Sequence, residues 1–464
     1  MRKQAVFRDH YSEAIDPPGN LASLRAAVAA EPGAVMLEST AAGPWGRYSV
    51  YAMRPARRIE CEAEEDVFSL LPKVGELRGM PPGAPFAGGW FGYLAYEAGR
   101  STEPSAGWKS RKLDVPTAVW GLYETVLLHD HDSDTWSIAG VDLGNSGEGF
   151  KQSARKWREL VQHSSDHSDG ELHATVNGAV WTPDQKSYLA QVERAIEYIR
   201  AGDIYQVNLA RRMRTNWNSP AHELYERLCG INPASHSAYV GIAPGKAIVS
   251  ASPELYLEVR DGIVTTRPIK GTRPRTGQPA ADEQARRELA TSPKERAELS
   301  MIIDLQRNDL GRVCETGTVR VESDGEIEVL PTVFHRTATV TGRLREDCGP
   351  VDLLRATFPG GSVTGAPKVR AMQIIQEMEP FARGSYCGAI GWIGAGGDMT
   401  LSLPIRTMLV HDGVADLFVG SGIVADSDPA SELAELEAKA AGMMAAIHGD
   451  GGLRRMAEMA ATSR

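Results

Sequence analysis

Residues 400–420 read TLSLPIRTMLVHDGVADLFVG, two apolar segments on either side of Asp412-Gly413. Asp-Gly is among the strongest hairpin signals, because both residues of a tight hairpin turn adopt positive φ. Further strand patterns occur in KAIVSAS (246–252) and LYLEVRDGIVTTRP (255–268). Hairpins that stand apart from helical stretches predict an α+β fold class with layered elements, not alternating βαβ units.

Helical periodicity surrounds these hairpins. We expect helices at about 281–312, 366–379 and 428–447, and a further one near Phe150–Gln162. Another helix is expected after Thr182-Pro183-Asp184-Gln185, with Thr182 as N-cap and Pro183 at the first helical position.

The chain divides into four parts by composition. Residues 1–145 form a strand-rich amino-terminal region, and residues 146–181 hold a helix and the polar linker HSSDHSDGELHATVNGA (163–179). Residues 182–450 form the region in which the candidate catalytic residues lie, and 451–464 form a tail.

Bulk properties exclude several classes of partner. The chain has 464 residues, of which 42% are hydrophobic and 24% charged, and its net charge of −10 argues against nucleic acid and anionic membranes as partners. It has no run of 18 apolar residues and no signal-peptide core at its start. The five cysteines are scattered and form no C-x-x-C pair, which predicts a reducing cytoplasm.

Two residues near strand ends have the chemistry of a nucleophile and an acid. Lys270, in Arg-Pro-Ile-Lys-Gly-Thr, precedes Gly271, where the backbone can approach a ligand closely. Glu254 lies at the start of an apolar strand, where burial raises the pKa of a carboxyl group and suits it to general acid catalysis. The alternatives are a surface lysine and a solvated strand-end carboxylate.

Carboxylates recur on two expected helices. Glu298 lies one turn after Glu295, which can also serve as the partner of a helix cap at Ser292. Glu432, Glu435 and Lys439 share one helix face, and a surface ion pair is the alternative interpretation there. If the two faces converge, their oxygen ligands suit Mg²⁺.

The loop FPGGSVTGAPK (358–368) resembles a phosphate-binding loop but lacks the Lys-Ser/Thr ending. Pro367 is predicted at the first position of a helix whose free N–H groups favour a carboxylate or a phosphate. Arg406, expected inside a strand, is a second candidate anion ligand. Gly420-Ser421-Gly422 offers backbone N–H groups or forms a plain turn.

Taken together and in order, these motifs resemble the chorismate-utilising enzymes, which include anthranilate, aminodeoxychorismate, isochorismate and salicylate synthases. The matching strings are GDIYQVNLARR (202–212), SPELYLE (252–258), RPIKGTRPR (267–275), ELSMIIDLQRNDLGRV (298–313), PGGSVTGAPKVRAMQII (359–375), YCGAIGW (386–392), LPIRTMLV (403–410) and GSGIVADSDPASELAELEAKA (420–440). The resemblance implies a layered β-sheet sandwich with helices on the outside.

The resemblance also implies roles for these residues. Chorismate would be the substrate, Lys270 the nucleophile and Glu254 the acid. Mg²⁺ would be held by Glu298 and Glu435, with Glu295 and Glu432 in support. The residues implied to bind substrate are Gly271, Thr272, Thr364, Tyr386, Arg406, Gly420, Ser421, Gly422 and Lys439.

Two positions distinguish the subfamilies. Members that add water to chorismate carry a lysine where this chain has Gln206, and anthranilate synthases typically carry alanine where it has Lys270. Lys270 is typical of aminodeoxychorismate synthases, which receive ammonia from a separate glutamine amidotransferase subunit. An anthranilate synthase that tolerates Lys270, and a non-catalytic tryptophan-binding relative, remain the alternatives.

The amino-terminal region resembles the family's tryptophan pocket. Leu37-Glu38-Ser39 and Gly46-Arg47-Tyr48-Ser49 match its first pieces, and an ordinary strand and turn is the alternative. The family usually has Asn-Pro-x-Pro later in this pocket, whereas Pro233 here belongs to Asn232-Pro233-Ala234-Ser235, which lacks the second proline.

Overall fold

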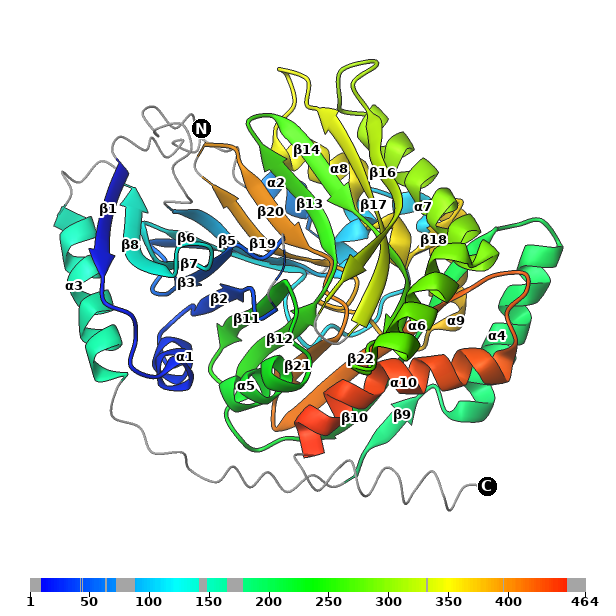
Figure 1. Cartoon of the computed structure of the whole chain (residues 1–464), viewed down its shortest axis with the longest axis horizontal. Coiled ribbons are helices and arrows are strands. Elements are labelled where there is room, and N and C mark those ends of the chain that lie inside the picture. Colours follow the sequence, from blue (N-terminus) through cyan, green and yellow to red (C-terminus); the bar gives the residue numbers. More distant parts are fainter. Residues whose placement is uncertain are drawn as a thin grey trace.

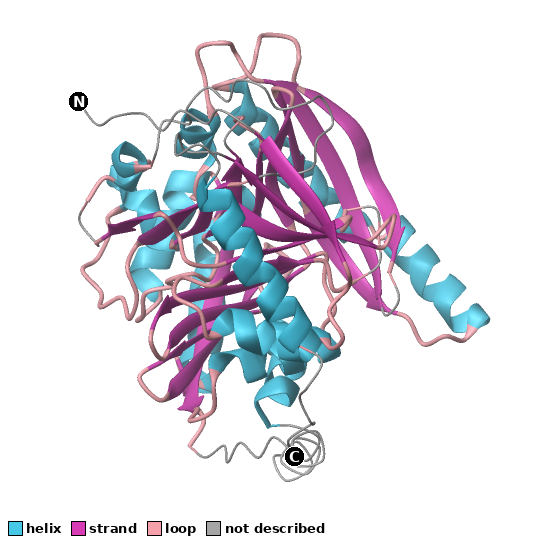
Figure 2. Ribbon diagram, turned by 90° about the vertical axis from the view of Figure 1, so that its left-hand side faces the viewer, coloured by secondary structure: helices cyan, strands magenta, loops and turns pink. Residues whose placement is uncertain are grey.

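The computed structural model describes residues 10–41, 43, 45–62, 65–71, 88–141, 148–164, 178–330, 333–394 and 396–448. Figure 1 shows two large β-sheets with helices on the outside, and the turned view of Figure 2 shows the strands as the inner layers. The expected linker at 163–179 lies mostly outside the described residues, and the tail at 451–464 lies wholly outside them.

The larger sheet, sheet A, has twelve antiparallel strands. In spatial order they are β1 (His10–Ile15), β8 (Thr135–Val141), β7 (Thr125–Asp130), β3 (Tyr48–Ala52), β2 (Val35–Glu38), β11 (His236–Ala243), β12 (Lys246–Ser252), β21 (Thr407–His411), β22 (Val414–Ile423), β10 (Gln206–Asn216) and β18 (Gly365–Ala366), with β9 (Val180–Thr182) also paired to β10. Asp412 and Gly413, with φ of +46° and +79°, form the predicted hairpin turn between β21 and β22.

The second sheet, sheet B, has ten antiparallel strands. In spatial order they are β15 (Ile269–Pro274), β17 (Val333–Arg343), β14 (Ile263–Arg267), β13 (Leu255–Arg260), β20 (Met399–Ser402), β19 (Ala389–Gly394), β5 (Gly89–Leu94), β6 (Ala118–Tyr123) and β4 (Arg57–Cys61), with β16 (Arg320–Val329) also paired to β17. Early and late strands therefore share both sheets, since β2 pairs with β11 and β5 pairs with β19.

Ten α-helices and three short 3₁₀ turns complete the described chain. They are α1 (Leu21–Ala29), α2 (Val67–Leu70), α3 (Glu148–His163), α4 (Gln185–Arg200), α5 (Ala221–Ile231), α6 (Pro279–Thr291), α7 (Pro293–Gly311), α8 (Pro350–Thr357), α9 (Lys368–Met378), α10 (Pro429–His448), η1 (Tyr96–Ser101), η2 (Pro104–Ala106) and η3 (Gly361–Val363). Helices α3, α5 and α10 pack on sheet A, and α6 and α7 pack on the β15–β17 end of sheet B (Figure 1).

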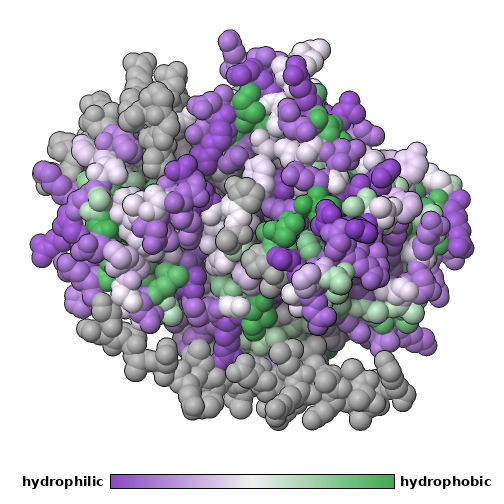
Figure 3. Space-filling view, in the orientation of Figure 1, coloured by the Kyte–Doolittle hydropathy of each residue, from purple (hydrophilic) through white to green (hydrophobic). Residues whose placement is uncertain are grey.

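The core lies between the two sheets. Val35 and Val50 of sheet A belong to one buried cluster with Phe91, Ile390 and Trp392 of sheet B. Such interdigitation of two inner faces is the basis of a sheet-on-sheet core. The predicted α+β sandwich with outer helices is confirmed. The face shown in Figure 3 is mostly hydrophilic, with hydrophobic side chains in small separate patches.

Three local predictions need correction. The stretch 281–312 is two helices, because Ser292 ends α6 and its side chain also caps α7. The N-cap of α4 is Asp184, whose carboxylate accepts a 2.7 Å hydrogen bond from the N–H of Ser187, whereas Thr182 ends strand β9. Pro367 is the N-cap of α9 and not its first helical residue.

None of the described helices combines the length and the apolar composition needed to span a membrane.

Candidate active site

A cavity of about 570 Å³ opens between α7, α10 and the neighbouring strands of both sheets. Thirteen of the residues predicted to act together line it: Glu254, Lys270, Gly271, Thr272, Glu295, Glu298, Tyr386, Arg406, Gly420, Gly422, Glu432, Glu435 and Lys439. They come from segments up to 185 residues apart in the chain (439 − 254), and only the packing of α7 and α10 beside the sheets brings them to one place.

Lys270 reaches the cavity from a bulge in strand β15. The register with β17 shifts between Ile269 and Thr272, and Gly271 has a φ of +81°. A bulge of this kind redirects a side chain out of the regular ladder. A Cβ added at Gly422 would lie 3.6 Å from Nζ of Lys270, which places the amine against bare backbone of β22.

Gly271 is required at its position for two reasons. Its positive φ is strained for any other residue, and an added Cβ would lie 2.8 Å from the carboxyl carbon of Glu295. The close approach of β15 to α7 therefore depends on a missing side chain. The approach places the amine-bearing bulge against the helix that carries Glu295 and Glu298.

Glu254 is buried directly before strand β13, with 5% of its surface exposed. The Ser362 hydroxyl donates a 2.8 Å hydrogen bond to Oε1. Burial raises the pKa of Glu254 to about 7, although the Ser362 hydrogen bond and the charge of Lys270 both act in the opposite direction. Near neutral pH a large fraction of this carboxyl group therefore carries a proton that it can give away.

Arg406 lies in the connection between β20 and β21, not inside a strand as predicted, and has a φ of +51°. Burial lowers the pKa of its guanidinium, and no carboxylate of the described residues counters that effect. A desolvated cation without a partner is a strong site for an anion. Tyr386, stacked on Phe418 with ring centroids 5.7 Å apart, lines the same cavity, and burial raises the pKa of its hydroxyl, which stays protonated.

The pKa values of Glu298 of α7 and Glu435 of α10 are shifted in opposite directions. Burial raises the pKa of Glu298, and Lys270 and Lys294 partly offset this while Glu295 and Glu435 add to it. Burial also opposes ionisation of Glu435, but Lys439, Lys294 and Lys270 together outweigh burial and lower its pKa. The Nζ atom of Lys439 lies 2.8 Å from a carboxylate oxygen of Glu435.

Glu295 and Glu432 are held by other side chains. Glu432 is buried and accepts hydrogen bonds from the hydroxyls of Ser421 and Ser427. Glu295 lies 3.5 Å from Arg273, and its own N–H donates to the Ser292 cap. Glu298 is the least firmly engaged of the four carboxylates, since its ion pair with Lys294 is 4.0 Å long. This set of hard oxygen donors fits Mg²⁺, which keeps open positions for a substrate.

A tighter group of potential metal ligands lies elsewhere, at Asp114, His411 and Asp416. Arg214 is already placed among them, with Nη2 2.9 Å from Asp114 and 2.6 Å from Asp416. A guanidinium in this position supplies the positive charge that a metal would bring. We interpret the group as a structural ion network.

Two predicted substrate residues do not line the cavity. The Thr364 hydroxyl is buried and donates to the carbonyl of Gly360 at 3.1 Å, within its own loop. The Ser421 side chain points to Glu432, because alternate residues of β22 face opposite sides of sheet A. Gly420–Gly422 is also not a turn, since it lies within β22.

Five polar or charged lining residues were not among the predicted site residues. They are Asn208, Arg273, Lys294, His335 and Ser362. Burial lowers the pKa of His335 to about 3, with the charges of Arg406 and Arg267 in the same direction, so its imidazole stays neutral. Arg273, Lys294 and Ser362 lie within two residues of a predicted site residue, whereas Asn208 and His335 lie more than twenty residues from any. A serine or an asparagine in a strand or loop carries no chemical signal of its own.

A second cavity of about 340 Å³ lies between β2, β3, β11 and the β19–β20 part of sheet B. Of the six residues predicted for a tryptophan pocket, Glu38, Arg47 and Tyr48 line it. Ser39, Ser49 and Pro233 do not, although Ser235 and His236 beyond the proline do. Trp45 and Trp392 supply aromatic surface.

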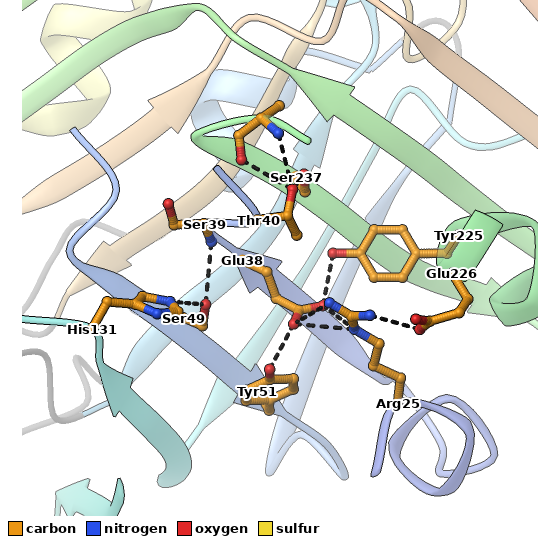
Figure 4. Close-up of polar contacts among 11 residues, drawn as sticks. Arg25, Glu38, Ser39, Thr40, Ser49, Tyr51, His131, Tyr225, Glu226 and Ser237 are labelled. Carbon is orange, nitrogen blue, oxygen red and sulfur yellow. Dashed lines mark hydrogen bonds and ion pairs between the residues drawn. The ribbon is translucent and has the colours of Figure 1, made fainter. Parts of the chain in front are cut away.

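The carboxylate of Glu38 is fully occupied by neighbouring groups (Figure 4). It lies 3.0 Å from Nε of Arg25 and accepts hydrogen bonds of 2.6 Å from Tyr51 and 2.8 Å from Tyr225. Arg25 also pairs with Glu226 at 2.6 Å. Since the carboxylate has no remaining acceptor position, Glu38 ties α1 and α5 to β2.

The sequence pattern of the family described as chorismate binding enzyme matches residues 33–445. The chain belongs to the chorismate-binding enzymes. It is 38% identical to aminodeoxychorismate synthase component 1 of Klebsiella aerogenes, over 76% of this chain and 76% of that one. It is 36% identical to anthranilate synthase component 1 of Streptomyces coelicolor, over 89% of this chain and 83% of that one.

Solved structures agree with this placement. Anthranilate synthase component I from Streptococcus pneumoniae superimposes with a TM-score of 0.77 at 30% identity, covering 87% of this chain and 93% of that one. The family match over residues 33–445 includes strands of both sheets and every residue that lines the large cavity. Relatives with two different activities are about equally similar, and the choice between them therefore rests on the residues of the cavity.

Proposed function

We propose that this protein aminates chorismate to 4-amino-4-deoxychorismate through a covalent bond to Lys270. The observation that carries the proposal is the meeting of an amine nucleophile and a buried acid in one cavity. Lys270 projects from the β15 bulge into the cavity that Glu254 also lines, and burial raises the pKa of Glu254 to about 7. An amine beside a protonated carboxyl group suits displacement of a hydroxyl, which is a poor leaving group.

Substrate binding would use the unpaired cation and the tyrosine of the cavity. Arg406 is desolvated and meets no carboxylate of the described chain, so a substrate carboxylate would gain a charge-assisted hydrogen bond there. Tyr386 offers a protonated hydroxyl on the same cavity wall. Bound Mg²⁺ would supply charge neutralisation for a second carboxylate, with Glu298 and Glu435 as its protein ligands.

In the first step, the neutral amine of Lys270 bonds to ring carbon C2, the ring electron pairs shift, and the C4–O bond breaks. Glu254 gives its proton to the departing oxygen, which leaves as water. In the second step, ammonia bonds to C4, the electron pairs return, and the C2–N bond breaks to restore the amine. The proton that ammonia sheds restores Glu254. The net reaction exchanges the hydroxyl for an amino group, in two displacements that are each easier than one.

Ammonia would come from a separate glutamine amidotransferase subunit, and the product would enter p-aminobenzoate and folate synthesis in the cytoplasm. We propose tryptophan as the ligand of the second cavity, on the support of its aromatic walls at Trp45 and Trp392. Since Glu38 is saturated, an amino group would have to meet Glu258, the other carboxylate that lines this cavity.

The second candidate function is that of an anthranilate synthase, favoured by the similar identity to relatives of that name. The two functions differ in product, because anthranilate forms with loss of pyruvate whereas aminodeoxychorismate retains the enolpyruvyl group.

The test is mass spectrometry of the full chain quenched after incubation with chorismate and Mg²⁺ but without ammonia. We expect an adduct on Lys270, absent in Lys270→Ala and present in Lys294→Ala, whose lysine lines the same cavity. Chromatography after addition of ammonium then identifies the product. Accumulation of anthranilate, with no adduct on Lys270, would overturn the proposal.

A further inference from the structure

Part of the wall of the large cavity is formed by strands β10 and β22, and β22 contributes only backbone at Gly420 and Gly422. In the register of β10 and β22, Asn208 lies opposite Gly422 and Ala210 lies opposite Gly420. Because both positions of β22 are glycine, no side chain from that strand covers this part of the wall, and the polar side chain of Asn208 lies over bare backbone.

Asn208 has no hydrogen-bond partner for its side-chain nitrogen among the described residues. The side chain lines the cavity and the residue is 7% exposed, while Nδ2 is buried and unpaired. A Cβ added at Gly420 would lie 3.0 Å from Nδ2 and 2.7 Å from the Tyr386 hydroxyl. Nδ2 and the Tyr386 hydroxyl therefore both pack against the bare backbone at Gly420, and Nδ2 keeps an unused donor there, although buried amide groups normally find partners.

The backbone holds this amide rigidly. The N–H of Asn208 donates to the carbonyl of Thr364 at 2.9 Å, and Nη2 of Arg383 donates to the carbonyl of Asn208 at 2.7 Å. Arg383 is itself fixed by a fully buried pair with Glu379 at 2.6 Å. A donor positioned so firmly, and left without an acceptor, is preorganised for a ligand.

We propose that Asn208 binds the substrate, with its side-chain N–H and the Tyr386 hydroxyl donating to one carboxylate oxygen of chorismate. The inference rests on the proposed function for the location of the substrate. Of the oxygens that chorismate offers, a carboxylate accepts from two converging donors most strongly, because the hydrogen bonds are charge-assisted. The alternative is that Asn208 only fills space in the cavity wall.

The test uses calorimetric titration of chorismate into the full-length protein with Mg²⁺. Asn208→Ala removes the donor, and we expect Kd to rise about 10- to 100-fold. Asn208→Asp keeps the size and shape but replaces the donor by a like charge, and we expect a larger rise. The matched control is Asn216→Asp, the same change at an exposed position near the far end of β10, which should leave Kd unaltered.

The outcomes separate the two ideas. Wild-type affinity in Asn208→Asp would overturn the inference, because a space-filling residue tolerates an isosteric change. If that variant does not fold, wild-type affinity in Asn208→Ala overturns the inference equally. The proposed function is tested separately, by analysis of the product that the wild-type protein forms. The affinity for chorismate tests the role of Asn208 whichever product forms.

Discussion

The two cavities differ in how their charged and polar groups are satisfied. In the large cavity, Arg406 meets no carboxylate of the described chain and Nδ2 of Asn208 has no acceptor. In the second cavity, Glu38 is saturated by Arg25, Tyr51 and Tyr225. Both cavities are lined by arginine, glutamate and tyrosine, so residue types alone do not separate them.

The difference shows in which cavity the folded protein leaves charged and hydrogen-bonding groups without a protein partner among the described residues, so that a ligand can bind them. Burying a polar group without a partner costs free energy, and a protein retains such groups mainly where something else will satisfy them. A saturated network such as that of Glu38 contributes to stability and fixes the packing of α1 and α5. Changes in the large cavity should therefore alter catalysis, whereas changes to the Glu38 network should alter stability.

The largest effect is expected for Lys270→Ala. Loss of the nucleophile should reduce the rate of chorismate amination on the order of 10³-fold, with little change in the melting temperature. Steady-state kinetics with ammonium measures the rate. Lys294→Ala, at an exposed position in the same cavity, should retain most of the activity. A small loss in Lys270→Ala would show that ammonia attacks the ring directly.

Glu254→Gln comes next, with an expected loss of about 10²-fold, the lower end of what a general acid contributes. With a pKa of about 7, Glu254 loses its proton as pH rises through neutrality, so adduct formation should fall on the alkaline side. Ser362 donates to the ionised carboxylate. Ser362→Ala should therefore raise the pKa of Glu254 and move the alkaline limb to higher pH. If the alkaline limb of the pH profile stays at the same pH in Ser362→Ala, that limb does not report the ionisation of Glu254.

Burial of Glu254 also affects stability. Since its pKa in the folded protein lies above the ordinary value of 4.5, its contribution to stability falls as pH rises from about 4.5 to about 7 and is constant above that. Glu254→Gln should remove this part of the pH dependence of unfolding. Thermal melts of both proteins between these pH values measure the difference.

Glu38→Gln should affect stability and leave catalysis intact. Removing one partner of a buried ion pair costs about 3 to 5 kcal/mol, and the lower end is expected because Arg25 keeps its pair with Glu226. Denaturant unfolding measures the loss, and kcat at a temperature where the variant is folded should match the wild type. A loss of kcat without loss of stability would contradict the comparison.

The smallest effect is expected for Arg47→Ala. Its side chain is 53% exposed, and its pair with Asp130 at 2.8 Å is therefore screened by solvent. The melting temperature should stay close to that of the wild type, at low and at high salt. A clear loss would mean that the rim of the second cavity carries more of the stability than its exposure implies.

Much of the local structure was predictable from short stretches of sequence. The Asp412-Gly413 hairpin and the long helix α10 were expected, because both depend on local turn chemistry or on 3.6-residue periodicity. The helix cap at Ser292 was also predicted and is confirmed as the start of α7, although the outer bounds 281–312 were given as one helical stretch. The cap at Asp184 was missed because three adjacent residues can all cap or begin a helix.

The sequence by itself determined the fold class, the family and the chemical types present in the large cavity, since these depend on local patterns and on motif order. Tertiary structure decided which of those groups remain available. Ser421 donates to Glu432 of α10, and Glu38 is saturated by Arg25, Tyr51 and Tyr225, each through contacts between segments that no local pattern encodes. Asn208 could be identified as a candidate only from the tertiary structure, because the lack of a hydrogen-bond partner for Nδ2 among the described residues is a property of the packed molecule.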